Sequence, residues 1–411
     1  MRIAVWHNLP SGGGKRALRD QVSMLMKRGH HVEIWRPLCA DHGPFDLSSY
    51  VNEHINPCRY YNPSQNNLFG KFKRLIGQYL NLYELNKNAK LCASEINERK
   101  FDVLLSHSCH FMGSPFIGRY IKIPSTLYLH EPNRILYEAK DRHPMALPSR
   151  PNNSFFPVKY YVAKFEDKFK HSFYRLKARE EASNASSFDT ILVNSYFNRE
   201  SVLRAYDINS QVCYLGVDTE LFKKNKIQPK GRYILAVGAM VREKNYSFLI
   251  QAISLIKKNK PKLIIVSNAG NPEYEDYVRE LAKNSKVPIE VYYNIPDDHL
   301  IRLYSGALLV AYAPRLEPFG YVPLEANACS TPVVAVAEGG VRETVVNELN
   351  GLLIDHDPQS MADAINSLLH YPEKAAVLGE NGRNFVEENW SLEKATDRLE
   401  MKLARQIGIE I

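Results

Sequence analysis

A nine-residue stretch in the last quarter of the chain holds the residue types best suited to binding a sugar and a phosphate. It reads Glu317-Pro318-Phe319-Gly320-Tyr321-Val322-Pro323-Leu324-Glu325. Pro318 and Gly320 predict a helix start, where the first backbone amides have no helical partner and attract an anion such as a diphosphate. Glu325, two turns along, and Glu317, before the helix, can each hold vicinal hydroxyls by charge-assisted hydrogen bonds. The stretch therefore predicts a nucleotide-sugar site, with one carboxylate for the ribose and one for the sugar.

Strand-like and helix-like segments alternate along most of the chain, which predicts parallel sheets covered by helices. In the first half the predicted strands are residues 3–6, 31–35, 103–106, 126–129 and 190–193. Polar residues follow four of these strands, namely His7, His107, His130 and Asn194. Because ligands of open parallel sheets bind beyond the carboxyl ends of the strands, we expect these side chains to lie near a ligand.

The length of 411 residues exceeds what one ordinary core holds and predicts two domains. Residues 220–232, rich in Lys, Asn and Gln, form the best linker candidate, because a second α/β pattern starts after them. Its predicted strands are residues 233–237, 263–267, 290–293, 308–311 and 333–336. We predict an N-terminal domain over residues 1–218, a C-terminal domain over residues 219–390, and a last helix within 391–411 that packs back on the first.

The motifs along the chain resemble those of the large retaining glycosyltransferase family 4, whose signature is the Glu-x7-Glu pattern. The other motifs stand in family order: Ser11-Gly12-Gly13-Gly14, His130-Glu131-Pro132, Val193-Asn194-Ser195, Gly216-Val217-Asp218, Gly238 with Lys244-Asn245, and Gly339-Gly340 with Glu343. The resemblance covers nearly the whole sequence. It implies an α/β protein of GT-B fold, with two Rossmann-like parallel-sheet domains that face each other across a cleft. The C-terminal domain would bind the donor and the N-terminal domain the acceptor.

The resemblance also implies roles for single residues. Glu325 would bind the ribose, Glu317 the donor hexose and Lys244 the diphosphate, while His130 would contact the donor sugar near its anomeric carbon. The remaining donor-binding positions would be Gly13, Gly14, Gly238, Pro318, Phe319, Gly320, Tyr321 and Val322. The family commonly has arginine directly after the glycine of its Gly238 motif, where this chain has Ala239. Either Arg242 reaches the diphosphate from a shifted position, or Lys244 and the helix amides suffice.

The implied reaction moves a hexose from a UDP- or GDP-hexose to a hydroxyl of a glycan, glycolipid or small-molecule acceptor, with retention of the anomeric configuration, as in polysaccharide biosynthesis. The nucleotide sugar is a substrate, so no cofactor is expected. The Asp-x-Asp sequence Asp355-His356-Asp357 precedes a proline and predicts a surface turn and helix start rather than a metal site. We therefore predict a metal-independent reaction in which fixed cations and helix amides stabilise the leaving diphosphate.

Two other functions fit parts of the sequence. Gly12 to Ala17 satisfies the dinucleotide pattern G-x-G-x-x-A, and Glu33 is a candidate ribose-binding acid, so an NAD-type oxidoreductase is an alternative. Against it, residues 8–11 separate the first strand from the glycines, and a second domain with its own Glu-x7-Glu would be unexplained. A non-catalytic nucleotide-sugar-binding subunit is the other alternative.

The net charge of +8 suits phosphorylated substrates, nucleic acid or an anionic membrane. Basic residues alternate with aromatic ones around residues 59–76 and 159–177, which resembles an interfacial helix; ordinary amphipathic helices with core-facing aromatics are the alternative. No nucleic-acid recognition motif accompanies them, so we exclude that partner. Six scattered cysteines and the lack of a long apolar segment predict a cytoplasmic protein, with the inner face of the membrane as its one membrane contact.

Overall fold

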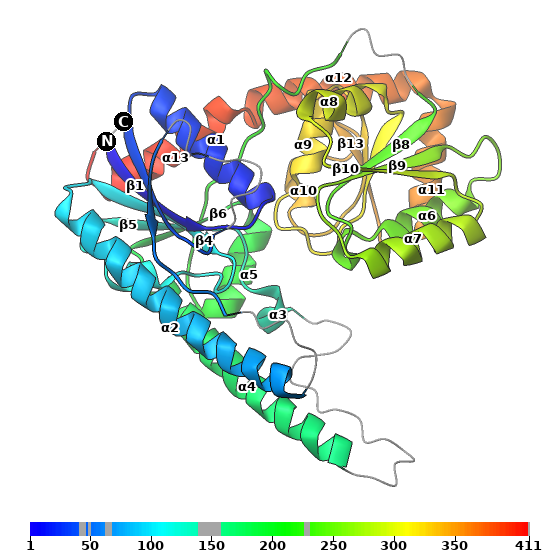
Figure 1. Ribbon diagram of the computed structural model, residues 1–411. Helices are drawn as coiled ribbons and strands as arrows, with labels where there is room; N and C mark the ends of the chain where they lie inside the picture. Colours follow the sequence, from blue (N-terminus) through cyan, green and yellow to red (C-terminus); the bar gives the residue numbers. More distant parts are fainter. Residues whose placement is uncertain (41–46, 48–50, 62–67, 139–157, 226–230, 410–411) are drawn as a thin grey trace. The chain divides into compact units, whose positions relative to one another are not determined.

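The computed structural model describes residues 1–40, 47, 51–61, 68–138, 158–225 and 231–409, which form two compact units (Figure 1). The first unit comprises residues 1–193, 199–213 and 399–411. The second unit comprises residues 194–198 and 214–398. The chain therefore passes from one unit to the other more than once, and the second unit is continuous from residue 214 to residue 398.

The first unit is built on a parallel sheet with seven strands among the described residues, in the order β3-β2-β1-β4-β5-β6-β7. Their bounds are β1 (Arg2–Asn8), β2 (His31–Pro37), β3 (Asn52–Asn56), β4 (Val103–Cys109), β5 (Ser125–Leu129), β6 (Thr190–Val193) and β7 (Gln211–Val212). The central strands β4 and β5 are buried along their whole length, as expected of a parallel sheet covered on both faces. The order changes direction beside β1, so the carboxyl ends of β1 and β4 flank the point where such sheets bind ligands.

Helical segments connect these strands. They are α1 (Gly13–Lys27), α2 (Leu68–Glu98), η1 (Phe116–Arg119), α3 (Arg134–Tyr137), α4 (Val158–Ala185) and α5 (Tyr196–Tyr206). The last helix, α13 (Leu392–Gln406), runs from the second unit into the first. Within the first unit, Gln406 donates to the Ser125 carbonyl oxygen at 2.7 Å and Lys402 donates to Gln211 at 2.8 Å. The end of α13 is thus fixed to β5 and β7.

The second unit is built on a parallel sheet with six strands among the described residues, in the order β10-β9-β8-β11-β12-β13. Their bounds are β8 (Tyr233–Val237), β9 (Lys262–Ser267), β10 (Ile289–Tyr293), β11 (Leu309–Tyr312), β12 (Val333–Val336) and β13 (Gly351–Ile354). The helical segments are η2 (Arg242–Lys244), α6 (Tyr246–Leu255), α7 (Pro272–Asn284), α8 (Asp297–Gly306), α9 (Tyr321–Ala328), α10 (Val341–Thr344), α11 (Pro358–His370) and α12 (Pro372–Asn389). Figure 1 shows helices on both faces of the sheet. The order again reverses direction, here between β8 and β11, which places η2 and α9 at the ligand-binding edge.

The predicted α/β class with two parallel sheets is confirmed, but three strands were not predicted. β3 reads Asn-Glu-His-Ile-Asn and is a polar edge strand, so it shows no apolar pattern. β7 has only two residues, and β13 has four. Each is fixed by its pairing with a neighbouring strand, which a local pattern does not reveal. The predicted linker at 220–232 lies partly outside the described residues, and the cleft predicted between the domains stays a prediction.

Candidate functional site

The Glu-x7-Glu stretch forms a turn and helix start at the carboxyl end of β11. Gly320 has φ +104°, a left-handed conformation that glycine adopts readily, and α9 begins directly after it at Tyr321. Its N-cap residue is Gly320, which has no side chain to cap the first amides of α9. Phe319 is buried, and its ring centroid lies 5.2 Å from that of Tyr321 and 5.7 Å from that of Trp390. The apolar residue of the motif therefore anchors the turn, while the amides of Tyr321 and Val322 stand at the helix start.

The Gly339-Gly340 motif supports this turn through close backbone packing. A Cβ atom on Gly339 would lie 2.4 Å from the Glu317 carbonyl oxygen, and one on Gly340 would lie 2.2 Å from the Pro318 carbonyl oxygen. The Gly340 amide donates to the Glu317 carbonyl oxygen at 2.8 Å. Only glycine permits this approach, so the two motifs form one structural element although more than 20 residues separate them.

Lys244 and Glu317 form a half-buried ion pair. The Lys244 ammonium lies 2.7 Å from Glu317 Oε2. Gly238, at φ +151°, brings the loop after β8 beneath this lysine, and a Cβ atom there would lie 3.3 Å from Lys244 Cδ. The Tyr246 hydroxyl donates to the Gly238 carbonyl oxygen at 2.7 Å and fixes the loop. The predicted phosphate-binding lysine and the predicted hexose-binding glutamate thus meet within one unit.

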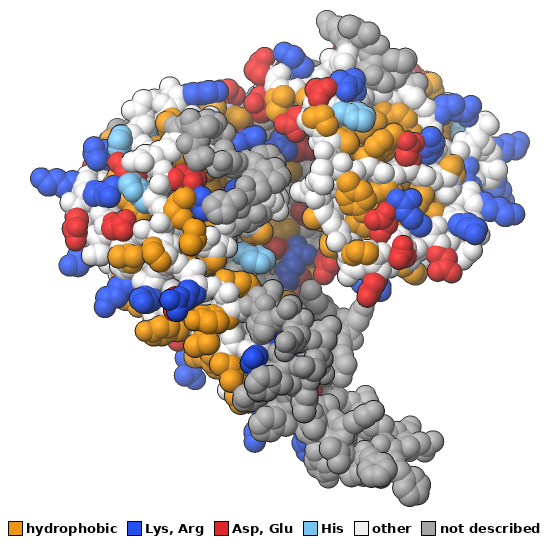
Figure 2. Space-filling view, viewed as in Figure 1, with side chains coloured by type: hydrophobic (Ala, Val, Ile, Leu, Met, Phe, Trp, Pro, Cys, Tyr) orange, Lys and Arg blue, Asp and Glu red, His pale blue; other side chains and the backbone are white. Residues whose placement is uncertain are grey.

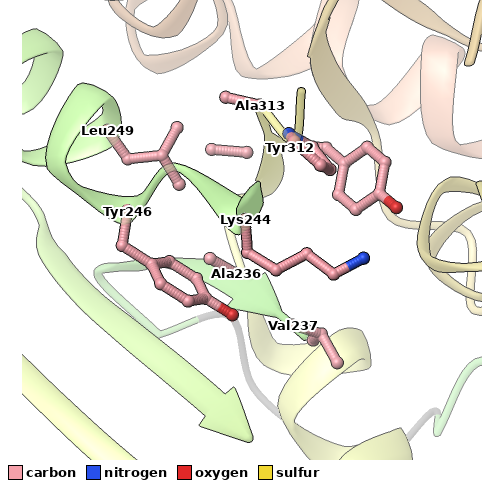
Figure 3. A pocket seen from close by; sticks show the side chains of 9 residues that line it. Ala236, Val237, Lys244, Tyr246, Leu249, Tyr312 and Ala313 are labelled. Carbon is pink, nitrogen blue, oxygen red and sulfur yellow. The ribbon is translucent and has the colours of Figure 1, made fainter. Parts of the chain in front are cut away.

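Lys244 also lines a small pocket. Its lining comes from β8, β11, the residues after β11, η2 and the start of α6, and includes Lys244, Tyr246 and Tyr312. Figure 3 shows the extended Lys244 side chain between the rings of Tyr246 and Tyr312. Apart from Lys244 and the two tyrosines, the lining side chains are apolar, so the walls hold the lysine stem while its ammonium reaches Glu317.

Glu325 lies in the second turn of α9 and is buried, with 3% of its surface exposed. The hydroxyl of Tyr304, a fully buried residue of α8, donates to Glu325 Oε2 at 2.6 Å. Tyr304 is fixed in turn because its carbonyl oxygen accepts from the Thr331 hydroxyl at 2.7 Å. A buried carboxylate needs hydrogen-bond donors, so Tyr304 stabilises and orients Glu325.

Arg242 points toward α7. Its guanidinium carbon lies 5.7 Å from the ring centre of Tyr274 and 5.9 Å from that of Tyr277. Both distances are within the range of cation–π attraction. The structure therefore brings Lys244 and Glu317 together and holds Arg242 on tyrosine rings of α7.

In the first unit, the glycine loop and two histidines meet at the carboxyl ends of β1, β4 and β5. A Cβ atom on Gly14, in the first turn of α1, would lie 3.5 Å from His130 Cδ2, whereas Gly13 is exposed. His130 Nε2 lies 3.2 Å from His107 Nδ1, and the two rings stack with their centroids 5.4 Å apart. His107 also stacks on Tyr128. The predicted donor-sugar histidine is therefore held by a second, fully buried histidine.

Burial favours the neutral form of these histidines. It lowers the pKa of His130 to about 4 and that of His107 well below its ordinary value. Burial, together with the charges of Lys15 and Arg36, lowers the pKa of His7 to about 3. Neutral imidazoles at physiological pH donate or accept hydrogen bonds, so His130 is suited to orient a sugar hydroxyl.

A model of Glycosyltransferase Family 4 matches residues 11–221, just over half of the chain. The chain belongs to glycosyltransferase family 4. A second model, of the Glycosyl transferases group 1, matches residues 217–385, the part that carries Lys244 and the two glutamates. The family inferred from the motif order is thus confirmed.

Among similar proteins of this family, the alpha-1,3/1,6-mannosyltransferase ALG2 of Mus musculus is 29% identical over 237 residues, which cover 51% of this chain and 57% of the mouse protein. A GDP-mannose-dependent alpha-(1-6)-phosphatidylinositol monomannoside mannosyltransferase of Mycolicibacterium smegmatis is 27% identical over 224 residues, 49% of this chain and 58% of that protein. These matches span somewhat more than half the length of the curated relatives.

Solved structures with the GT-B fold superpose on almost the whole length of this chain. Sucrose-phosphate synthase from Thermosynechococcus elongatus superposes with a TM-score of 0.73 at 18% identity, covering 99% of both chains. Alr3699/HepE from Anabaena, crystallised with UDP and glucose, superposes with a TM-score of 0.69 at 18% identity, covering 98% of this chain and 99% of that one. At this identity the likeness establishes the fold alone.

The structure corrects the interpretation of Glu33 as a ribose-binding acid. Glu33 is the third residue of β2 and pairs in register with Ala4, near the amino ends of the strands, whereas Gly13 and Gly14 follow the carboxyl end of β1. Its carboxylate accepts from His31 Nε2 at 2.9 Å and His54 Nε2 at 2.7 Å. Glu33 therefore lies toward the amino ends of the strands, away from the glycine loop. The dinucleotide-binding alternative is left without its candidate ribose-binding carboxylate.

The structure also places the other sequences considered for metal and membrane contacts. Asp357 is the N-cap of α11 and accepts from the Ser360 amide at 2.8 Å, as the predicted helix start requires. Among the described residues, no group of three or more His, Cys, Asp or Glu side chains is arranged to hold a metal ion. In the same part of the chain, no helix combines the length and the apolar character needed to cross a bilayer. Metal independence itself stays a prediction.

Two residues near the predicted site were not identified as functional. Tyr304 precedes Glu325 by 21 residues and belongs to no motif, so no sequence signal indicates their contact. His107 was noted as a polar residue at a strand end, and β4 and β5 are adjacent in the sheet. That signal could have paired it with His130, the corresponding residue after β5.

Proposed function

We propose that this chain is a retaining glycosyltransferase that moves a hexose from a UDP- or GDP-hexose to a hydroxyl of a glycan or glycolipid, without a divalent metal. The observation that carries the proposal is the Lys244–Glu317 ion pair beside the start of α9, where glycine is the N-cap. A cation for phosphate, helix-start amides for phosphate and a carboxylate for hydroxyls lie within one loop system. The names of the relatives, which include two mannosyltransferases, support the same activity.

In the proposed complex the second domain, residues 219–390, binds the donor. The diphosphate accepts hydrogen bonds from the α9 amides and from Lys244, which exchanges Glu317 for phosphate oxygens. Glu317, released from the lysine, accepts hydrogen bonds from hexose hydroxyls. Glu325, oriented by Tyr304, accepts from the ribose hydroxyls. Gly238 allows the backbone of its loop to approach the diphosphate closely.

The first domain, residues 1–218 with the end of α13, binds the acceptor and supplies Gly13, Gly14 and His130. His130 acts as a neutral hydrogen-bonding residue near the anomeric carbon. The acceptor hydroxyl attacks on the face that the leaving group vacates, forms the new C–O bond and passes its proton to a phosphate oxygen as the old C–O bond breaks. The nucleoside diphosphate departs, and the product keeps the donor configuration.

Substitution of the two glutamates tests this proposal. Glu325→Ala should weaken both the bare nucleoside diphosphate and the intact donor, because the ribose is present in both. Glu317→Ala should mainly lower turnover, because the hexose changes charge and shape only in the transition state. Isothermal titration with UDP and GDP, set beside initial rates with UDP- and GDP-hexoses, measures both effects. Glu373→Ala, on an exposed residue of α12, is the matched control and should change neither.

The outcome also separates binding from catalysis. If Glu317→Ala weakens the bare diphosphate as much as Glu325→Ala does, the assigned roles of the two glutamates are wrong. Tight diphosphate binding without turnover of any donor would favour the non-catalytic subunit instead. A donor at a hundred times its dissociation constant stabilises the protein by about 2.7 kcal/mol, so a thermal-shift screen identifies the base.

A further inference from the structure

The helix α2 carries exposed side chains of only two kinds over residues 73–91. Eight described side chains in this span are exposed: Lys73, Arg74, Ile76, Leu80, Tyr83, Lys87, Lys90 and Leu91. Four are basic and four are apolar or aromatic, and no exposed side chain described in the span is acidic. A solvated helix face normally mixes acidic with basic residues. Figure 2 shows basic and hydrophobic side chains next to one another in the region of α2. The composition of this face is therefore not that of an ordinary water-facing surface.

The exposed apolar residues form one stripe. Ile76, Leu80, Tyr83 and Leu91 recur at spacings of three, four and eight residues, which places them on one side of a helix. Tyr83 exposes 64% of its surface, and Ile76 and Leu91 expose 40% and 44%. The opposite side of α2 is already used by the core, where its buried side chains include Leu82, Leu85, Ala89, Cys92 and Ile96. The outward stripe is thus additional to what the fold requires.

We propose that this outward face of α2 binds the surface of an anionic lipid bilayer. The stripe would enter the interfacial region, while Lys73, Lys87 and Lys90, which lie on the same side of the helix among the apolar residues, would meet the lipid phosphates. The 19 residues of the span, 73–91, extend about 27 Å along the helix axis, enough to lie flat on a membrane. The apolar lysine stems can lie beside the inserted residues while the ammonium groups stay at the depth of the lipid phosphates.

The charge of the face argues for lipid over a second copy of the chain. A twofold dimer through α2 would place the same basic residues against each other, without acidic partners among the exposed side chains of the span. Aliphatic residues at the centre of the stripe also suit acyl chains better than nucleic acid, which is bound by cations and aromatic stacking.

Of the two stretches that the sequence indicated as interfacial, 59–76 overlaps the start of this face of α2, and the inference extends the contact along α2 and leaves out 159–177. In α4, Phe173 is buried and its ring lies 5.2 Å from that of Tyr79 of α2, and Lys177 is also buried. For these residues the alternative of core-facing aromatics is confirmed. Tyr160, Tyr161 and Phe165 have side chains outside the described residues.

Vesicle flotation tests the proposal on the full chain. The wild type should bind vesicles of 30% phosphatidylglycerol in phosphatidylcholine at low salt. Binding should weaken steeply as the salt concentration rises, because each lysine near the surface contributes about fivefold to the affinity by electrostatic attraction, which salt screens. The Lys73→Gln, Lys87→Gln, Lys90→Gln triple variant should lose roughly a hundredfold. The Ile76→Ser, Leu80→Ser, Tyr83→Ser variant should lose at least about tenfold in vesicle affinity, because each substitution removes apolar surface that would otherwise be buried in the bilayer.

Matched controls lie in the second unit. Lys257→Gln with Lys258→Gln and Lys283→Gln removes the same charge, and Leu255→Ser with Val346→Ser and Leu349→Ser removes exposed apolar groups. Both controls should bind vesicles like the wild type, and all variants should bind nucleoside diphosphate equally, which separates this inference from the proposed transfer reaction. Absence of wild-type binding to anionic vesicles, equal losses in the controls, or a dimer that only the α2 variants dissociate would overturn the proposal.

Discussion

Glu325 is a buried carboxylate that accepts a hydrogen bond from the Tyr304 hydroxyl. Tyr304→Phe removes the donor to Glu325 Oε2 and leaves the ring in place. Hydrogen bonds to charged groups contribute about 1.5–3 kcal/mol, so the free energy of unfolding should fall by about 2 kcal/mol. The dissociation constant of the nucleoside diphosphate should rise several-fold, because the carboxylate loses its orientation. Urea unfolding and isothermal titration measure the two effects.

Tyr277→Phe is the control for this prediction, because it removes a hydroxyl from an exposed ring of α7. It should leave stability and affinity unchanged. A Tyr304→Phe variant that loses stability but binds the diphosphate like the wild type would show that Tyr304 supports folding alone.

His7 makes stability depend on pH. Its folded pKa, about 3, lies below the unfolded value near 6.5, so the folded state resists protonation and the unfolded state takes up the proton first. This stabilising contribution is complete above about pH 6.5 and is lost as the pH falls toward 3, by about 1.4 kcal/mol per pH unit. His7→Gln should therefore flatten the pH dependence of the free energy of unfolding between about pH 6 and 4 by that amount. Urea titrations across this range measure the slope, and an unchanged slope contradicts the prediction.

At the scale of elements, the start of α9 depends on how closely a neighbouring glycine turn approaches it. A Cβ atom on Gly340 would lie 2.2 Å from the Pro318 carbonyl oxygen, so Gly340→Ala must displace the backbone of the Glu317 turn. We expect a loss of about 2 kcal/mol or more in stability, with weaker diphosphate binding. Thermal denaturation and isothermal titration measure these changes.

Gly29→Ala provides the comparison, because Gly29 has φ +81° but no atom lies within 4 Å of the place that an added methyl group would take. It should lower stability by about 1 kcal/mol through backbone strain and leave diphosphate binding unchanged. Equal effects of the two substitutions would mean that the close packing of Gly340 against the Glu317 turn contributes nothing to stability or to diphosphate binding.

At the scale of the whole molecule, the charges available to the leaving group decide the role of metals. Lys244 and the α9 amides are fixed groups, and the net charge of +8 adds a favourable field for a diphosphate. Initial rates of transfer should therefore be the same with and without EDTA. Loss of activity on chelation, restored by magnesium or manganese, would contradict the prediction.

The Lys244→Gln variant completes this experiment. It should lower turnover in EDTA and in magnesium alike, because the missing cation is part of the protein. Rescue of Lys244→Gln by magnesium alone would mean that a metal can take the place of the lysine and that the site is less specific than proposed.

The order of residues along the chain was enough to predict the class, the family and the polar residues at the ends of strands. Alternating apolar segments predicted parallel sheets, and because all strands of such a sheet end at one edge, polar residues such as His107 and His130 were expected near a common ligand. The turn at Gly320 was also predictable, since glycine and proline constrain the backbone locally.

Which of these residues touch, and which do not, became known only from the folded chain. Tyr304 reaches Glu325, Lys244 pairs with Glu317, and Arg242 lies on the tyrosines of α7, although nothing in their local sequence specifies these partners. The outward stripe of α2 was likewise hidden, because apolar residues occur on both sides of that helix and only packing shows which side the core covers. Local sequence sets backbone preference and periodicity, whereas contacts between distant segments depend on strand order and side-chain packing, which the whole chain determines together.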